Sequence, residues 1–84
     1  MGTNSPIIPA ETAAHVLFHY GHDGGYQAGT FTTNLITAID SADPSNKARL
    51  ELGFPDYVAA VNAMQYSHNG VEYLQSIVRG GVAA

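Results

Sequence analysis

Apolar residues recur at helical spacing along most of this chain. The first run falls at positions i, i+3, i+4 and i+7, which makes a single stripe, on Ala13, Val16, Leu17 and Tyr20. Later segments repeat this kind of spacing and are separated by glycine or proline. The pattern predicts helices over about residues 10–20, 30–42, 44–52, 55–68 and 70–79.

The apolar positions of the later predicted helices indicate which of their side chains should be buried. The second helix should bury Phe31, Leu35, Ala38, Ile39 and Ala42. The fourth should bury Tyr57 or Val58, with Val61 and Met64, and the fifth Val71, Leu74, Ile77 and Val78. No alternating β pattern of useful length appears. The fold class predicted is therefore all-α: a compact bundle of about four to five short helices, with a glycine-rich loop between the first two.

Helix-end signals support these boundaries. Gly21 can close the first helix in the left-handed conformation. Asp43-Pro44 offers an N-cap followed by proline at the first helical position. Asn69 followed by Glu72 resembles a capping box at the start of the last helix.

The chain organises as one small domain. We expect an extended N-terminal segment over residues 1–9, a single helical domain over 10–79 and a C-terminal tail over 80–84. With 84 residues and no cysteine, the chain has neither a disulfide staple nor a thiolate metal site. A core of this size gives little margin of stability, so a homo-oligomer is expected.

The charge balance excludes several classes of partner. Three basic residues face seven acidic ones, for a net charge of −4. Coating a nucleic acid or anchoring to an anionic membrane requires many cations. No apolar run is long enough to span a bilayer and no targeting segment is visible, so a cytoplasmic protein is expected. One small anion could still be held by backbone amides and a single arginine.

Most of the candidate chemistry lies between residues 19 and 33. Glycines permit close approach of a ligand, and the second helix offers unpaired amides and threonine hydroxyls at its start. Two tyrosines could stack on a planar base. The candidate ligand-binding residues are Tyr20, His22, Asp23, Gly25, Tyr26, Gly29, Thr30, Phe31, Thr32, Thr33 and, as the cation, Arg49.

Other interpretations of this stretch stay open. One alternative is that the glycines serve only a helix crossover, with the threonines as caps. The spacing from Gly24 to Gly29 superficially resembles a P-loop, but lysine and a preceding strand are missing, which excludes ATP hydrolysis. Metal binding through His15 and His19 is weakly indicated by their i, i+4 spacing, with Glu11, His22 or Asp23 completing the set. Acid–base catalysis by His22 and Asp23 is equally non-specific.

Two stretches carry a resemblance. The run from Phe18 to Thr33, Phe-His-Tyr-Gly-His-Asp-Gly-Gly-Tyr-x-x-Gly-Thr-Phe-Thr-Thr, and the run from Ala42 to Val58 with its Asp-Pro and Gly-Phe-Pro steps resemble small proteins of actinobacterial phages. The likeness covers about residues 15–80. It implies a phage accessory protein in the host cytoplasm, of the kind that sequesters nucleotide signals of bacterial defence systems, such as cyclic oligonucleotides or cyclic ADP-ribose isomers.

The first functional expectation is therefore a homo-oligomeric, non-catalytic binding protein for a small nucleotide-derived ligand, with no cofactor and no metal. Tyr20 and Tyr26 would stack on the base, while amides from Gly29 to Thr32 and Arg49 would hold phosphate or ribose. The alternative is a protein–protein inhibitor or adaptor of a host protein. A small hydrolase using His22 and Asp23 comes third.

Overall fold

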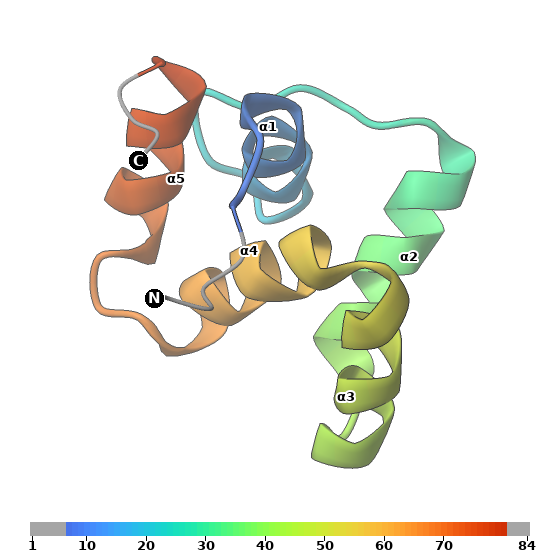
Figure 1. Ribbon diagram of the computed structural model, residues 1–84. Coiled ribbons are helices and arrows are strands. Elements are labelled where there is room, and N and C mark those ends of the chain that lie inside the picture. The colour runs from blue at the N-terminus through green and yellow to red at the C-terminus, as the bar shows by residue number, and fades with distance from the viewer. Residues whose placement is uncertain (1–6, 81–84) are drawn as a thin grey trace.

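The computed structural model describes residues 7–80, which contain five helices and no strand. In chain order they are α1 Ala10–His19, α2 Thr30–Ser41, α3 Pro44–Gly53, α4 Pro55–Tyr66 and α5 Gly70–Val78 (Figure 1). The all-α prediction is confirmed, and each helix ends within two residues of its predicted boundary. No helix in the described part of the chain is both long and apolar enough to cross a membrane.

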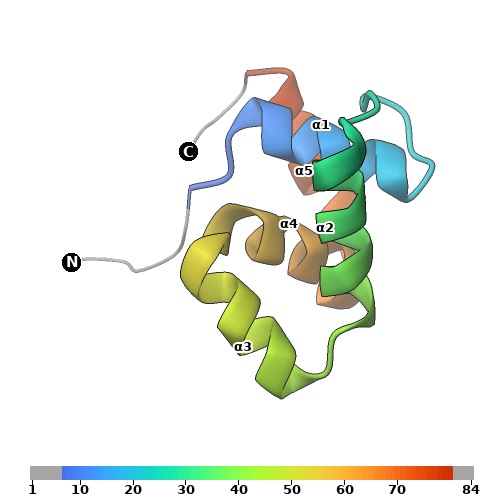
Figure 2. The same ribbon diagram turned by 90° about the vertical axis from the view of Figure 1, so that its right-hand side faces the viewer.

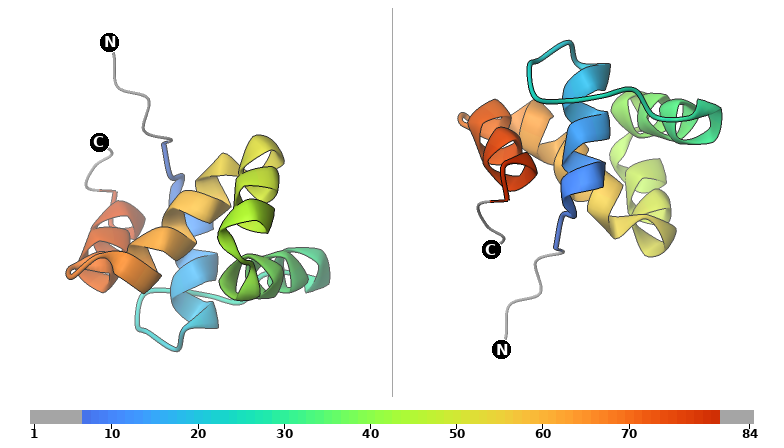
Figure 3. Two further views of the ribbon diagram at one scale, coloured as in Figure 1. Left: turned by 90° about the horizontal axis from the view of Figure 1, so that it is seen from below. Right: turned by 90° about the horizontal axis from the view of Figure 1, so that it is seen from above.

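Two helices form the centre of the bundle. α1 packs against α5, α4 and α2, and α4 contacts all of the other helices. In the end-on views, α1 and α4 cross at the middle of the molecule (Figure 3). α3 contacts only α4 and α2, and it lies at the edge of the bundle, away from α1 (Figure 2). This arrangement leaves one side of α3 and α4 open to solvent.

The core lies where α1 meets its three neighbours. Six consecutive residues of α1, 12–17, are buried, because helices cover this segment on several sides. Two of the six are polar, and both have partners. Thr12 Oγ1 donates to Asp56 Oδ2 at 2.7 Å, and His15 Nδ1 lies 2.9 Å from the Tyr57 hydroxyl. The largest fully buried side chains are Leu17, Ile36, Ile39, Leu74, Val16, Val58 and Val61.

The predicted stripe of α2 is partly wrong. Phe31 is 67% exposed and Ala38 is exposed, whereas Ile36 is almost completely buried. α2 is rotated so that Leu35, Ile36 and Ile39 face the bundle. The first turn of α2 extends past the core, and there Phe31 has a tilted contact with Phe54, with ring centroids 6.1 Å apart.

Two of the three predicted helix-end signals are confirmed. Asp43 caps α3 by accepting from the Asn46 amide at 2.8 Å, and Gly21 has a φ of 79° after α1. The capping box at Asn69 is wrong, because its side chain makes no cap hydrogen bond. The α4–α5 turn instead depends on close packing: a Cβ on Gly70 would lie 2.0 Å from the Ala63 carbonyl oxygen.

The predicted terminal segments fall mostly outside the described residues, which exclude 1–6 and 81–84. Within the predicted N-terminal segment, Ile8 is buried in the core and Ile7 is 84% exposed.

Candidate functional site

The glycine-rich loop is fixed to the helices beneath it. After Gly21 the chain turns back along α1, and the Tyr26 amide donates to the Ala14 carbonyl at 3.3 Å. Gln75 of α5 donates its Nε2 to the Asp23 carbonyl at 2.9 Å. A Cβ on Gly25 would lie 2.4 Å from the Ala14 oxygen, so the loop backbone touches α1 directly. Figure 3 shows the loop crossing α1 on its way to α2.

The two tyrosines proposed for base stacking lie apart. Tyr20 donates its hydroxyl to the Asp40 carboxylate, in the last turn of α2. Tyr26 is 53% exposed and makes a T-shaped contact with the His15 ring, with centroids 5.4 Å apart and an interplanar angle of 88°. His15 is in turn hydrogen-bonded to the hydroxyl of Tyr57, in the first turn of α4. The structure therefore does not bring the two rings to one ligand site at the start of α2.

The remaining loop candidates are mostly exposed. His22, Asp23, Gly29, Thr30 and Phe31 lie at the surface. Gly25 and Thr32 are half-buried, and so is Thr33, whose hydroxyl donates to the Ala28 carbonyl at 3.4 Å and closes the loop onto α2.

Arg49 lies on α3, away from the loop. Its Nη1 is 3.5 Å from Asn46 Oδ1, and it lines a shallow groove with Ala38 and Ser41, near the C-terminal end of α2. A helix rises by about 1.5 Å per residue, so the length of α2 separates this guanidinium from the amides at the start of α2. The predicted combination of Arg49 with those amides does not form.

A small cavity does exist beneath the loop. It is lined by His15, Phe18, His19, Gln27, Ala28, Thr33 and Ile36 and has a volume of about 150 Å³. Sites for ligands of drug size are typically about 300–1,000 Å³. The loop cavity is therefore too small to enclose a nucleotide.

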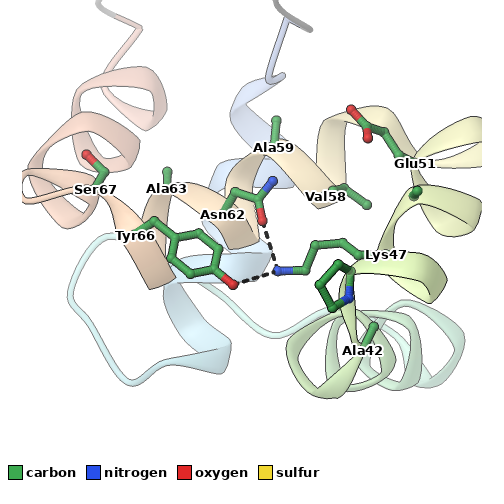
Figure 4. A pocket seen from close by; sticks show the side chains of 11 residues that line it. Ala42, Lys47, Glu51, Val58, Ala59, Asn62, Ala63, Tyr66 and Ser67 are labelled. Carbon is green, nitrogen blue, oxygen red and sulfur yellow. Dashed lines mark hydrogen bonds between the residues drawn. The ribbon is translucent and has the colours of Figure 1, made fainter.

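A larger groove lies between α3 and α4. Its volume is about 580 Å³, and it is lined by Ala42, Pro44, Lys47, Ala48, Glu51, Val58, Ala59, Asn62, Ala63, Tyr66 and Ser67 (Figure 4). Alanines of α3 and α4 give the lining its apolar part, and Lys47, Asn62 and Tyr66 give it polar groups. Because α3 buries no residue completely and packs only on α4 and α2, the groove stays open to solvent.

Lys47 supplies the positive charge of this groove. Its Nζ donates to Asn62 Oδ1 at 3.0 Å, to Gln65 Oε1 at 2.7 Å and to the Tyr66 hydroxyl at 3.4 Å. It also lies 4.9 Å from the centroid of the Tyr66 ring. Within residues 7–80, no carboxylate oxygen comes within 4.0 Å of this ammonium. The three acceptors are neutral and together use the three N–H donors of the ammonium, so they orient it without a direct ion pair.

A hydrogen-bonded network behind the groove sets the position of Gln65. Its Nε2 donates to the carbonyl and the Oδ1 of Asp40 at 3.0 and 3.1 Å, which directs its amide oxygen to Lys47. The Tyr20 hydrogen bond, and then that of Gln65, holds the pKa of Asp40 below its ordinary value. Burial, and then the hydrogen bond to Asp40, raises the pKa of Tyr20 well above its ordinary value. Residues of α2, α3 and α4, with Tyr20 directly after α1, thus contribute to one polar network.

Sequence reasoning missed this groove. Lys47 and Asn62 belong to different helices, and their helical periodicity places each on a polar face without showing that the faces meet. The one signal in the sequence was the cluster of alanines at 59, 60 and 63, whose small side chains leave space beside the fourth helix. Two of these, Ala59 and Ala63, line the groove.

The histidines do not assemble with other ligands. His15 Nε2 is 3.9 Å from Glu11 Oε2, and its other ring nitrogen is bonded to Tyr57. Across residues 7–80, no three histidine, aspartate or glutamate side chains form a group that could hold a metal ion.

No protein-family model, curated protein or solved structure matches this chain. Only the chemistry of the groove and of the loop bears on function.

Proposed function

We propose that this protein binds a small, anionic, nucleotide-derived ligand without altering it chemically, and that the ligand occupies the groove between α3 and α4. The observation that carries this proposal is the Lys47 ammonium, held by neutral acceptors beside an exposed aromatic ring. An ammonium is a good partner for phosphate, and a ligand phosphate would replace the longest of the three hydrogen bonds, the one to the Tyr66 hydroxyl at 3.4 Å. An aromatic face is a good partner for a base.

The dimensions of the groove suit such a ligand. Its volume of about 580 Å³ lies within the ordinary range for small-molecule sites. Ala59 and Ala63 leave room for a flat ring along α4. Lys47 lies over one face of the Tyr66 ring, and because Tyr66 is 75% exposed we expect a base to stack on the other face. The Asn62 amide stands where it can pair with a polar edge of a base. A second copy of the chain over the open side would bury the ligand further, which fits the predicted homo-oligomer.

The resemblance to small actinobacteriophage proteins supplies a biological setting. In that setting the protein sequesters a cyclic oligonucleotide or a cyclic ADP-ribose isomer and so counters a bacterial defence system. Sequestration requires tight binding and slow release, and it requires no reaction. We expect the ligand to be recovered intact after heat denaturation of the complex, whereas a hydrolase using His22 and Asp23 would yield a product.

A thermal-shift panel of cyclic nucleotides and cyclic ADP-ribose isomers tests the proposal. Ligand at 100 times its Kd stabilises the folded state by about 2.7 kcal/mol. For a domain of this size that is a rise in Tm of roughly 10–20 °C. Lys47→Gln should abolish the shift. Arg49→Gln is the matched control, because it removes the same charge from the same helix but lies in a different groove.

Two results would count against this function. If no member of the panel shifts the Tm of the wild type, the ligand-binding proposal fails. If Arg49→Gln weakens binding as much as Lys47→Gln, binding reflects overall charge and the groove is not the site.

A second candidate function is an adaptor or inhibitor that docks on a host protein. The observation that favours it is the exposure of large apolar side chains, notably Phe31 at 67% and Leu52 at 89%. A Leu52→Ser variant should then lose a host protein that the wild type retains stoichiometrically, while Lys47→Gln retains it. Equal retention by all three proteins would exclude docking through Leu52.

A further inference from the structure

Resting on the proposed function, we infer that the groove selects a singly charged phosphodiester over a doubly charged terminal phosphate, and that Glu51 is the residue that sets this preference. The inference concerns the charge of the phosphate group that the groove prefers. This preference follows from the number and placement of the ionised groups around the groove.

Lys47 and Glu51 are neighbours on α3. They are four residues apart, which places them one turn apart on one face of the helix, and both line the groove. Figure 4 shows Lys47 extended toward Tyr66, with Glu51 on the other side of Lys47. Glu51 is exposed, and no Lys47 nitrogen lies within 4.0 Å of its carboxylate. The carboxylate therefore adds negative potential to one end of the groove.

The groove has a single cation for its ligand. The other two basic residues of the chain lie outside this groove: Arg49 lines the separate groove near Ala38 and Ser41, and Arg79 follows α5. Asp40 lies behind Gln65 and adds negative potential. Lys47 can thus meet the single charge of one phosphodiester group in the groove, whereas a second charge on that same phosphate has no cation to meet it.

Phosphate esters differ in the number of negative charges that one phosphate group carries. A phosphodiester carries one negative charge, whereas a terminal phosphate carries about −1.5 to −2 at pH 7, with a second pKa near 6. The extra charge would be repelled by Glu51 across an open, hydrated groove. Such a repulsion lowers affinity by about 3- to 5-fold at low ionic strength, and salt weakens it.

A matched pair of ligands tests the inference: 3′,5′-cyclic AMP and 5′-AMP share base, sugar and phosphorus count and differ in charge. With calorimetry at low salt and pH 7.5, the wild type should bind the cyclic ligand about 3- to 5-fold more tightly. Glu51→Gln should raise the affinity for 5′-AMP and bring the ratio close to one. Glu72→Gln, a control that removes one exposed carboxylate from α5, should leave the ratio unchanged. At pH 5 the wild type should also lose the preference, because 5′-AMP is then mostly singly charged.

The outcomes separate this inference from the function on which it rests. If the wild type binds both nucleotides equally, or binds 5′-AMP more tightly, the inference is overturned and the proposed function stands. The same holds if Glu51→Gln leaves the ratio unchanged, or if a larger ligand binds but neither adenosine nucleotide does. If no nucleotide of any kind binds, both are overturned.

Discussion

Replacement of Gly25 by alanine tests whether the glycine-rich loop is primarily a structural crossover. The new Cβ would lie 2.4 Å from the Ala14 oxygen, 2.5 Å from the Phe18 nitrogen and 3.0 Å from the Leu17 Cβ. Two of these neighbours are backbone atoms of α1 and cannot rotate away. The loop would therefore have to move by roughly 1 Å to reach ordinary contact distances, which begin near 3.4 Å.

The expected loss of stability combines several effects. Such overpacking costs about 1–3 kcal/mol. Movement of the loop also weakens the hydrogen bond from the Tyr26 amide to Ala14 and the edge contact of Tyr26 with His15. Each of these contributes about 0.5–1.5 kcal/mol. The lower entropy of the unfolded alanine chain returns about 0.4–1 kcal/mol. We expect the free energy of unfolding to fall by about 2–3 kcal/mol, a large part of the stability of so small a domain.

Urea denaturation followed by far-UV circular dichroism measures this loss. Gly29→Ala is the control from the same loop, because its Cβ would have no atom within 4 Å and its φ is −69°. Because Gly29 is the N-cap of α2, where alanine is less favourable than glycine, the gain from a stiffer unfolded chain is offset and stability should change by less than about 1 kcal/mol. If the two variants unfold within about 0.5 kcal/mol of each other, the close packing of the loop on α1 is refuted.

Three further predictions concern the scaffold. Leu74→Ala removes the one large side chain of α5 that is fully buried and should lower the free energy of unfolding by about 2–5 kcal/mol in urea titrations. Asp43→Ala removes the cap of α3 and should destabilise by about 1 kcal/mol, whereas Asp43→Asn, which still offers an acceptor oxygen, should lose much less. Tyr20→Phe should be less stable than the wild type at neutral pH, and the difference should disappear at both extremes of pH. The lowered pKa of Asp40 gives stability that is lost as pH falls below its ordinary value of 3.8. The raised pKa of Tyr20 gives stability that is lost as pH rises above its ordinary value of 10.0, so a difference that is constant from pH 3 to pH 11 would contradict the network.

The contacts of the glycine-rich loop favour a structural role over the predicted ligand-binding role. Its glycines permit a tight turn after α1 and close packing on that helix, and the cavity beneath it is small. The Tyr20 hydroxyl donates a hydrogen bond to Asp40. This bond links the end of α1 to the network that positions Gln65 and Lys47. One residue of the predicted loop site thus contributes indirectly to the groove on which the proposed function rests.

Local information in the sequence was enough to predict the helices. Their number, type and boundaries follow from apolar spacing within each segment and from local signals such as Asp43-Pro44 and Gly21, all of which act over a few residues. The same spacing identified three buried residues of α1, Ala13, Val16 and Leu17. It missed the other three, Thr12, Ala14 and His15, because the neighbouring helices cover α1 on several sides.

Tertiary packing decided what local signals could not. The rotation of α2, with Ile36 inside and Phe31 outside, depends on which helices lie beside it. The groove depends on the meeting of Lys47 with Asn62 and Tyr66, which are 15 and 19 residues away along the chain. Periodicity assigns each residue to a face of its own helix, but the angle and contact between two helices come from the packing of the whole core. For this reason the sequence by itself determined the five helices and the loop, and only the fold placed a lone ammonium beside an exposed tyrosine.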